Sequence, residues 1–146
     1  KKNCENRIPK SKRLNISDKQ LLNNLKNKVP KLINLMNNQE LNEYIKIVVS
    51  FSFDANKYFN DSKPWELKKT NVKRMNTIIF TISEQIKNIS ILLNPIMPNS
   101  TSKILDYLNI NKDDITLDNI KEFKKFKNNV KDKKISILFK KIEDDN

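Results

Sequence analysis

The chain has 146 residues, of which 29 are lysine or arginine and 17 are aspartate or glutamate, and it contains neither glycine nor histidine. Without glycine it cannot build the glycine-rich loops that cradle phosphates, and without histidine it lacks the commonest general base and a usual zinc ligand. We therefore expect no catalytic residue, no metal site and no bound cofactor in this chain itself.

The single cysteine, Cys4, excludes an internal disulfide and fits a reducing compartment, so the expected location is the cytoplasm. No apolar run approaches the roughly 20 residues of a membrane span, and no apolar signal segment follows Lys1 and Lys2. The sequence begins without methionine, which predicts a piece of a longer protein.

The net charge of +12 is concentrated in two end segments. Residues 1–13 hold six basic residues and one acidic residue, and residues 121–141 hold nine lysines and two acidic residues. If these segments lie together, they form a surface that attracts phosphates. Lysine outnumbers arginine by 26 to 3, a bias that an A+T-rich genome also produces, so the sequence alone leaves both explanations open.

The first predicted helix covers residues 18–37. Ser17 followed by Gln20 is typical of a capping box, and apolar residues then recur every three or four positions. Pro30 falls inside this pattern and is expected to kink or break the helix. A similar apolar stripe predicts a second helix over residues 40–59.

A polar break at residues 60–65 follows the second helix. Asn71 is placed to cap a third long helix, which Pro95 and Pro98 end. This third helix is predicted over residues 72–93. A shorter helix is predicted over 101–108, and residues 113–128 are expected to form a short helix or a polar loop. Residues 130–143 are ambiguous between a strand-like tail and a last helical turn.

Three long helices with apolar stripes can bury those stripes only against one another. The predicted fold class is therefore all-α, an antiparallel helix bundle. We expect the bundle to cover residues 17–143, after a basic linker or remnant over residues 1–16 and before an acidic tail over residues 144–146.

Trp65, the one tryptophan, follows Pro64 in the polar break between two long helices. A ring in this position either covers the end of the bundle or stands exposed as a platform for a base or a partner. Periodicity alone favours the covering role.

The break and its flanking helices carry a family pattern. Residues 55–67, A-N-K-Y-F-N-D-S-K-P-W-E-L, resemble the A-N-x-Y-[IF]-x-x-x-x-P-W-x-L signature of the methionyl-tRNA synthetase anticodon-binding domain. Residues 84–98, 100–108 and 138–143 resemble later segments of that family in the same order. The resemblance extends over about residues 17–143.

This resemblance implies a bundle of the class I synthetase anticodon-binding type that recognises the CAU anticodon loop of methionine tRNA. In the family, the tryptophan of the P-W motif stacks on the first anticodon base, which makes Trp65 the expected platform. Pro64 is expected to set the backbone that presents the ring, and Asn56 to order the helix end beside it.

The resemblance also implies a parent enzyme. That enzyme is expected to be an ATP-dependent methionine–tRNA ligase, with its catalytic domain in the same polypeptide and no membrane partner. This chain alone is expected to be non-catalytic.

Two features depart from the family pattern. The family also reads the anticodon with an N-x-x-x-R pair on a first helix, but Asn3 and Arg7 lie too close to Ser17 to be that pair. The chain is therefore expected to begin just after that helix. Lys87 stands where the family has arginine, which keeps the charge but loses the bidentate fork.

Two other functions remain open from the residues alone. One is a basic helical protein-interaction module with no RNA role, in which Trp65 belongs to the core. The other is a membrane-surface domain, which the mutually matched apolar stripes disfavour.

Overall fold

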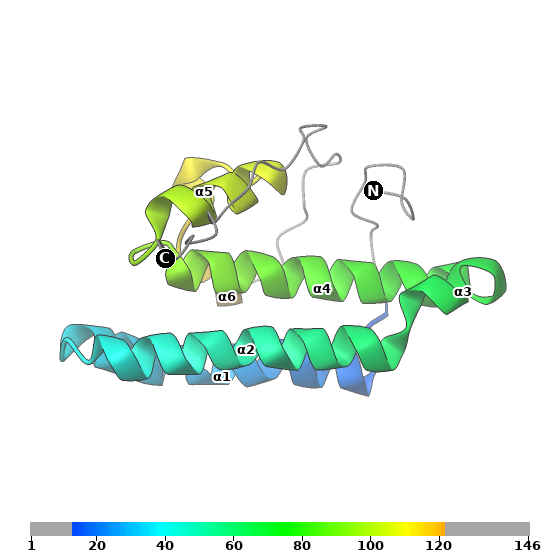
Figure 1. Ribbon diagram of the computed structural model, residues 1–146, viewed down its shortest axis with the longest axis horizontal. Coiled ribbons are helices and arrows are strands. Elements are labelled where there is room, and N and C mark those ends of the chain that lie inside the picture. The colour runs from blue at the N-terminus through cyan, green and yellow to red at the C-terminus, as the bar shows by residue number, and fades with distance from the viewer. Residues whose placement is uncertain (1–12, 122–146) are drawn as a thin grey trace, which may run out of the picture.

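The computed structural model describes residues 13–121, and within them it is a helical bundle with no strand (Figure 1). The elements in chain order are α1 (Ile16–Asn37), α2 (Leu41–Ser62), α3 (Pro64–Thr70), α4 (Val72–Leu93), α5 (Pro98–Tyr107), the 3₁₀ turn η1 (Lys112–Asp114) and α6 (Asp118–Lys121). The predicted all-α fold is confirmed.

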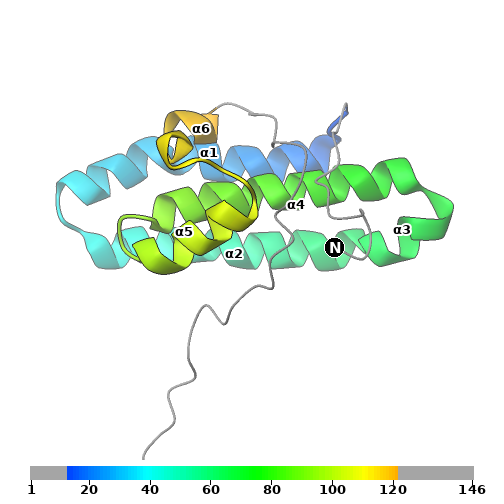
Figure 2. The same ribbon diagram turned by 90° about the horizontal axis from the view of Figure 1, so that it is seen from above.

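The three long helices are packed in two layers. Helices α1 and α2 lie antiparallel in one layer, and α4 lies in a second layer, where it packs against both (Figures 1 and 2). Helix α5 packs on α4, and the short α3 connects the end of α2 to the start of α4. Among the residues described, no helix is long and apolar enough to cross a membrane.

Helix α1 begins with a different cap from the predicted one. The Asn15 side chain accepts a hydrogen bond from the Asp18 N–H at 3.0 Å, and the Asp18 carboxylate accepts one from the Asn15 N–H at 2.9 Å. The prediction of a Ser17–Gln20 box is therefore wrong. Asparagine is as good an N-cap as serine, so local preference could not choose between these neighbours.

Pro30 does not break α1, which runs through it without interruption. The proline is exposed, whereas Val29 and Leu32 beside it are buried. The missing backbone hydrogen bond thus falls on the solvent side, and packing of the buried side keeps the segment helical.

Helix α4 is the central element, because it contacts α1, α2, α3, α5 and α6. Glu84, Gln85 and Asn88 are completely buried on it. Val72 and Ile86, which by their helical spacing are expected on the apolar stripe of this helix, are instead 51% and 39% exposed. The predicted stripe on this helix is therefore partly wrong, because a helix covered on several sides buries polar positions too.

One buried ion pair lies within this polar part of α4. The Lys87 ammonium donates to Glu84 Oε1 at 2.5 Å and to the backbone carbonyl of Asn119 at 2.9 Å. Burial raises the pKa of Glu84, although the neighbouring Lys87 and Lys26 charges oppose that shift. Lys87 therefore links α4 to the chain at α6 from inside the bundle.

Several helix ends differ from the predicted ones. Helix α2 extends to Ser62, and α5 begins at Pro98 rather than at residue 101. Asn71 caps α4 as predicted, since its side chain accepts from the Arg74 N–H at 3.0 Å. The predictions for residues 130–143 and for most of the two basic end segments lie outside the described residues.

Candidate functional site

A single residue, Lys63, separates α2 from α3. Its backbone is left-handed (φ 42°, ψ 59°), and its N–H closes α2 by donating to the Phe59 carbonyl at 3.1 Å. Pro64 occupies the first turn of α3, where a missing N–H costs nothing and a fixed φ suits the helix. Trp65 thus lies on a short helix, which corrects the prediction of a loop.

The Trp65 ring lies at the end of the bundle formed by α3. It is 50% exposed, and its centroid lies 5.7 Å from that of Phe59, with the two planes inclined by 57°. Phe59 supports the indole ring while half of its surface stays open to solvent. The ring is therefore not sealed in the core and is available as a platform.

The other two predicted site residues differ in their surroundings. Pro64 is buried beneath the start of α3, next to Trp65 in the chain. Asn56 is exposed on α2, six residues before that helix ends at Ser62. Pro64 and Trp65 are thus brought together, whereas Asn56 lies further down the surface of α2.

Beneath α3, one carboxylate connects three helices. Asp18 of α1 is fully buried and accepts two hydrogen bonds from the Arg74 guanidinium of α4, at 2.7 and 2.9 Å. It also accepts a hydrogen bond from the hydroxyl of Tyr58 on α2. This cluster fixes the ends of α1, α2 and α4 relative to one another, directly under the element that carries Trp65.

The pKa values in the cluster follow from these contacts. Burial alone would raise the pKa of Asp18, but hydrogen bonds from Arg74, Tyr58 and the Asn15 N–H together hold it below its usual range. Burial and the bond to Asp18 raise the pKa of Tyr58, so the phenol remains a donor. The bond to Asp18 likewise raises the pKa of Arg74.

Sequence reasoning missed this cluster because Asp18 and Arg74 are 56 positions apart. It also missed a local concentration of charge, since it compared only the ends of the chain with everything between them. A shorter window would have found six basic residues and two acidic ones around Trp65, namely Lys57, Lys63, Lys68, Lys69, Lys73 and Arg74 against Asp61 and Glu66.

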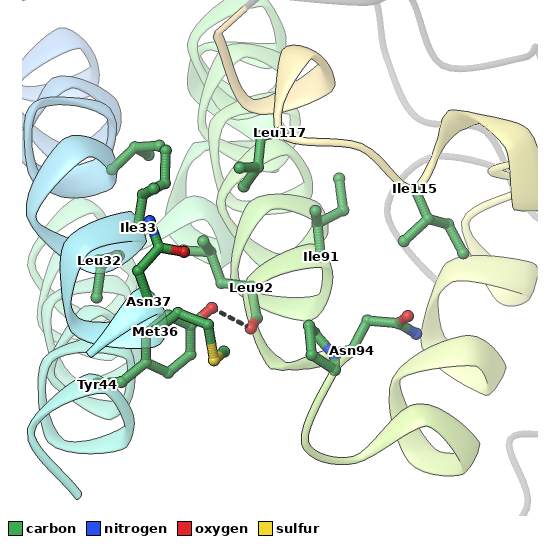
Figure 3. A pocket seen from close by; sticks show the side chains of 12 residues that line it. Leu32, Ile33, Met36, Asn37, Tyr44, Ile91, Leu92, Asn94, Ile115 and Leu117 are labelled. Carbon is green, nitrogen blue, oxygen red and sulfur yellow. Dashed lines mark hydrogen bonds between the residues drawn. The ribbon is translucent and has the colours of Figure 1, made fainter. Parts of the chain in front are cut away.

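A hollow lies at the end of the bundle opposite α3, between α1, α4 and the segment after η1 (Figure 3). Its cavity volume is about 280 Å³, and most of its lining is aliphatic. The Tyr44 hydroxyl beside it donates to the Leu92 carbonyl at 2.6 Å, and the Asn94 amide turns away to Thr101 of α5 at 3.0 Å. The hollow therefore offers little polar chemistry to a ligand.

No group of three or more potential metal ligands occurs in residues 13–121. The chemistry that the α3 end can offer is that of a half-open aromatic ring with the exposed lysines Lys63, Lys68 and Lys69 close to it in the chain, of which Lys63 pairs with the exposed Glu66 at 3.4 Å. This combination suits stacking on a base and attraction of phosphates.

Comparisons with known proteins point to one family. A family model described as the anticodon binding domain of methionyl tRNA ligase matches residues 8–146. The chain is 36% identical over 80 residues to a methionine–tRNA ligase of Rickettsia felis, which is 55% of this chain and 16% of that protein. It is 30% identical over 112 residues to the enzyme of Brucella suis, which is 77% of this chain and 22% of that protein.

Solved structures agree on the fold. Methionyl-tRNA synthetase of Mycobacterium tuberculosis in its free state superposes with a TM-score of 0.83 at 21% identity, covering 96% of this chain and 29% of that one. The same enzyme in complex with methionyl-adenylate gives a TM-score of 0.80 at 23% identity, covering 88% of this chain and 26% of that one. The chain thus spans between about a sixth and three-tenths of the length of these proteins.

Proposed function

Because the chain belongs to the family of anticodon-binding domains of methionyl-tRNA ligase, we propose that it recognises the CAU anticodon of methionine tRNA and stacks the first anticodon base on Trp65. The half-exposed indole ring at the basic end of the bundle is the observation that carries this proposal. A ring of this kind accepts the flat face of a nucleobase without needing any movement of the core.

The residues around the ring have separate roles in this proposal. Lys63 turns the chain between α2 and α3, and the buried Pro64 starts α3 in a fixed direction, so together they aim Trp65 outward. The surrounding lysines attract the phosphates of the loop, a contribution that should weaken as salt increases.

The parent protein would charge methionine tRNA. Its catalytic domain, in the same polypeptide, would use ATP to activate methionine in the cytoplasm, and this chain would contribute recognition of the tRNA. The name methionine–tRNA ligase of the relatives supports this assignment.

Substitution of Trp65 tests the proposal. Trp65→Ala should weaken binding of the anticodon stem-loop of methionine tRNA about tenfold or more, because stacking one base on a ring contributes roughly 1–3 kcal/mol. Binding is measured by titration calorimetry with the full chain, and Leu41→Ala, an exposed apolar change at the opposite end, serves as the control.

The proposal fails if the unaltered chain binds a stem-loop with a permuted anticodon as tightly as the cognate one. It also fails if Trp65→Ala lowers the melting temperature strongly while binding stays unchanged, since the ring would then be a part of the fold. Salt-insensitive, weak RNA binding would favour the protein-interaction module instead.

A further inference from the structure

The solvent side of α2 carries an unusual set of side chains, which we name the outer face of α2. Its members recur at spacings of three and four positions, so they lie along one side of the helix, and all are exposed. They are Asn42, Lys46, Val49, Phe53, Asn56, Lys57 and Asn60.

Phe53 is the most unusual member of this face, because its ring is 70% exposed. Val49, one turn earlier, is 39% exposed, so the two residues form only a small apolar patch. Protein-docking surfaces usually have a broader apolar centre than two side chains provide.

The rest of the outer face offers amides and ammonium groups, and the exposed carboxylates Glu43 and Asp61 lie at its edge. Lys57 lies one turn beyond Phe53, and Lys46 lies two turns before it, within 3.8 Å of Glu43 in a pair that is exposed on both sides. Such an exposed ion pair contributes little to stability, so the Lys46 ammonium can exchange Glu43 for another anionic partner. Asp54 lies on the flank toward α1, where it accepts a hydrogen bond from Asn24 at 3.0 Å.

The outer face leads toward Trp65. From Phe53 to Asn60 it advances about 10 Å along the axis, at about 1.5 Å per residue. Asn56 lies one turn before Phe59, and Phe59 packs against the Trp65 ring. A strand bound at Trp65 can therefore continue along α2 without crossing another element.

We propose that the outer face of α2 extends the RNA interface, with Phe53 as a second stacking platform. Loop nucleotides next to the base on Trp65 lie along this face, one of them stacks on Phe53, and Lys57 and Lys46 bind phosphates. This inference rests on the proposed function, because it needs RNA at Trp65. An aromatic ring on one helix face with two ammonium groups and three amides suits a single strand of RNA.

The test compares three substitutions at one position in the full chain. Phe53→Ala and Phe53→Leu should each weaken binding of the methionine-tRNA anticodon stem-loop about fivefold to tenfold, whereas Phe53→Tyr should bind as the unaltered chain does. Leucine keeps an apolar side chain but loses the flat ring, so it separates stacking from apolar contact. The melting temperature should change little in all three, because the ring is largely exposed.

Different failures have different meanings. If Trp65→Ala weakens binding while Phe53→Ala does not, the outer face of α2 is not part of the interface and the proposed function stands. If the unaltered chain does not bind the cognate stem-loop selectively, the proposed function itself has failed. If Phe53→Ala instead converts a dimer to a monomer in light scattering, the face binds a second copy of the chain and the inference is overturned.

Discussion

At the scale of single residues, the ionised Asp18 stabilises the place where α1, α2 and α4 meet. Its carboxylate is buried, but the Arg74 guanidinium and the Tyr58 hydroxyl compensate for the lost water. Because the folded pKa lies below the ordinary value of 3.8, the stabilisation is fully present above the unfolded pKa. It is lost as the pH falls through the folded pKa.

Asp18→Asn should lower the free energy of unfolding at pH 7 by about 2–4 kcal/mol, because it leaves the Arg74 charge without its partner. The variant should also lose less stability than the unaltered chain as the pH falls from about 5 to 2. Urea unfolding at several pH values measures both effects. Asp54→Asn, which changes a half-buried carboxylate that accepts a hydrogen bond from Asn24, is the control and should cost less than about 1 kcal/mol. Equal pH profiles for the two variants would contradict this account.

At the scale of elements, α1 contains a proline that its packing tolerates. Pro30→Ala should restore a backbone hydrogen bond and remove the contact of the ring with the preceding turn. We expect a gain of about 1–3 kcal/mol in the free energy of unfolding, reduced somewhat because the unfolded chain becomes freer. Thermal unfolding measures the gain, with the exposed Lys31→Ala as control. A loss of stability would show that the proline ring makes a contact that the helix needs.

The sequence predicted those features of the helices that depend on neighbouring residues and missed those that depend on distant ones. The three long helices follow from local periodicity, and the Asn71 cap follows from one residue and its neighbours, so both were predictable. The cap at Asn15 was not, because Asp18 also binds groups on α2 and α4 that are distant in the sequence. The buried Glu84 and Lys87 were missed for the same reason, since a charged pair looks exposed until its partner at Asn119 is placed.

The site was predicted in part. Residue type and motif pointed to Pro64 and Trp65, but their place on a helix depends on the left-handed backbone of Lys63, which no local preference of lysine predicts. The exposure of the ring depends on how α3 packs against α4, which is a property of the assembled bundle. The role of the ring in RNA recognition stays a prediction.

At the scale of the whole molecule, charge is distributed unevenly between the two ends. The end with α3 is rich in lysine. At the other end, Glu40 lies in the turn between α1 and α2 and Glu43 in the first turn of α2, and the segment from η1 to α6 carries Asp113, Asp114 and Asp118. If the chain binds RNA as proposed, this distribution favours approach of the RNA at the end with α3 over the other end.

Lys69→Ala should reduce the steepness with which stem-loop affinity falls as salt rises. Each phosphate contact contributes about 0.7–0.9 to the slope of log affinity against log salt, so the slope should decrease by about that amount if Lys69 binds one phosphate. Lys112→Ala, at an exposed lysine in η1, should leave the slope unchanged. Equal slopes for both variants would place the phosphates elsewhere than beside α3.

The one-residue joint at Lys63 has a consequence for how this protein can vary. Surface connections generally accept extra residues, but adding or removing one here would change the direction in which α3 leaves α2, because a single left-handed residue makes the whole turn. The indole would then no longer be held at its present place against Phe59. We therefore expect the distance in sequence between α2 and the tryptophan to be kept fixed among working versions of this domain, even where the surrounding side chains change freely.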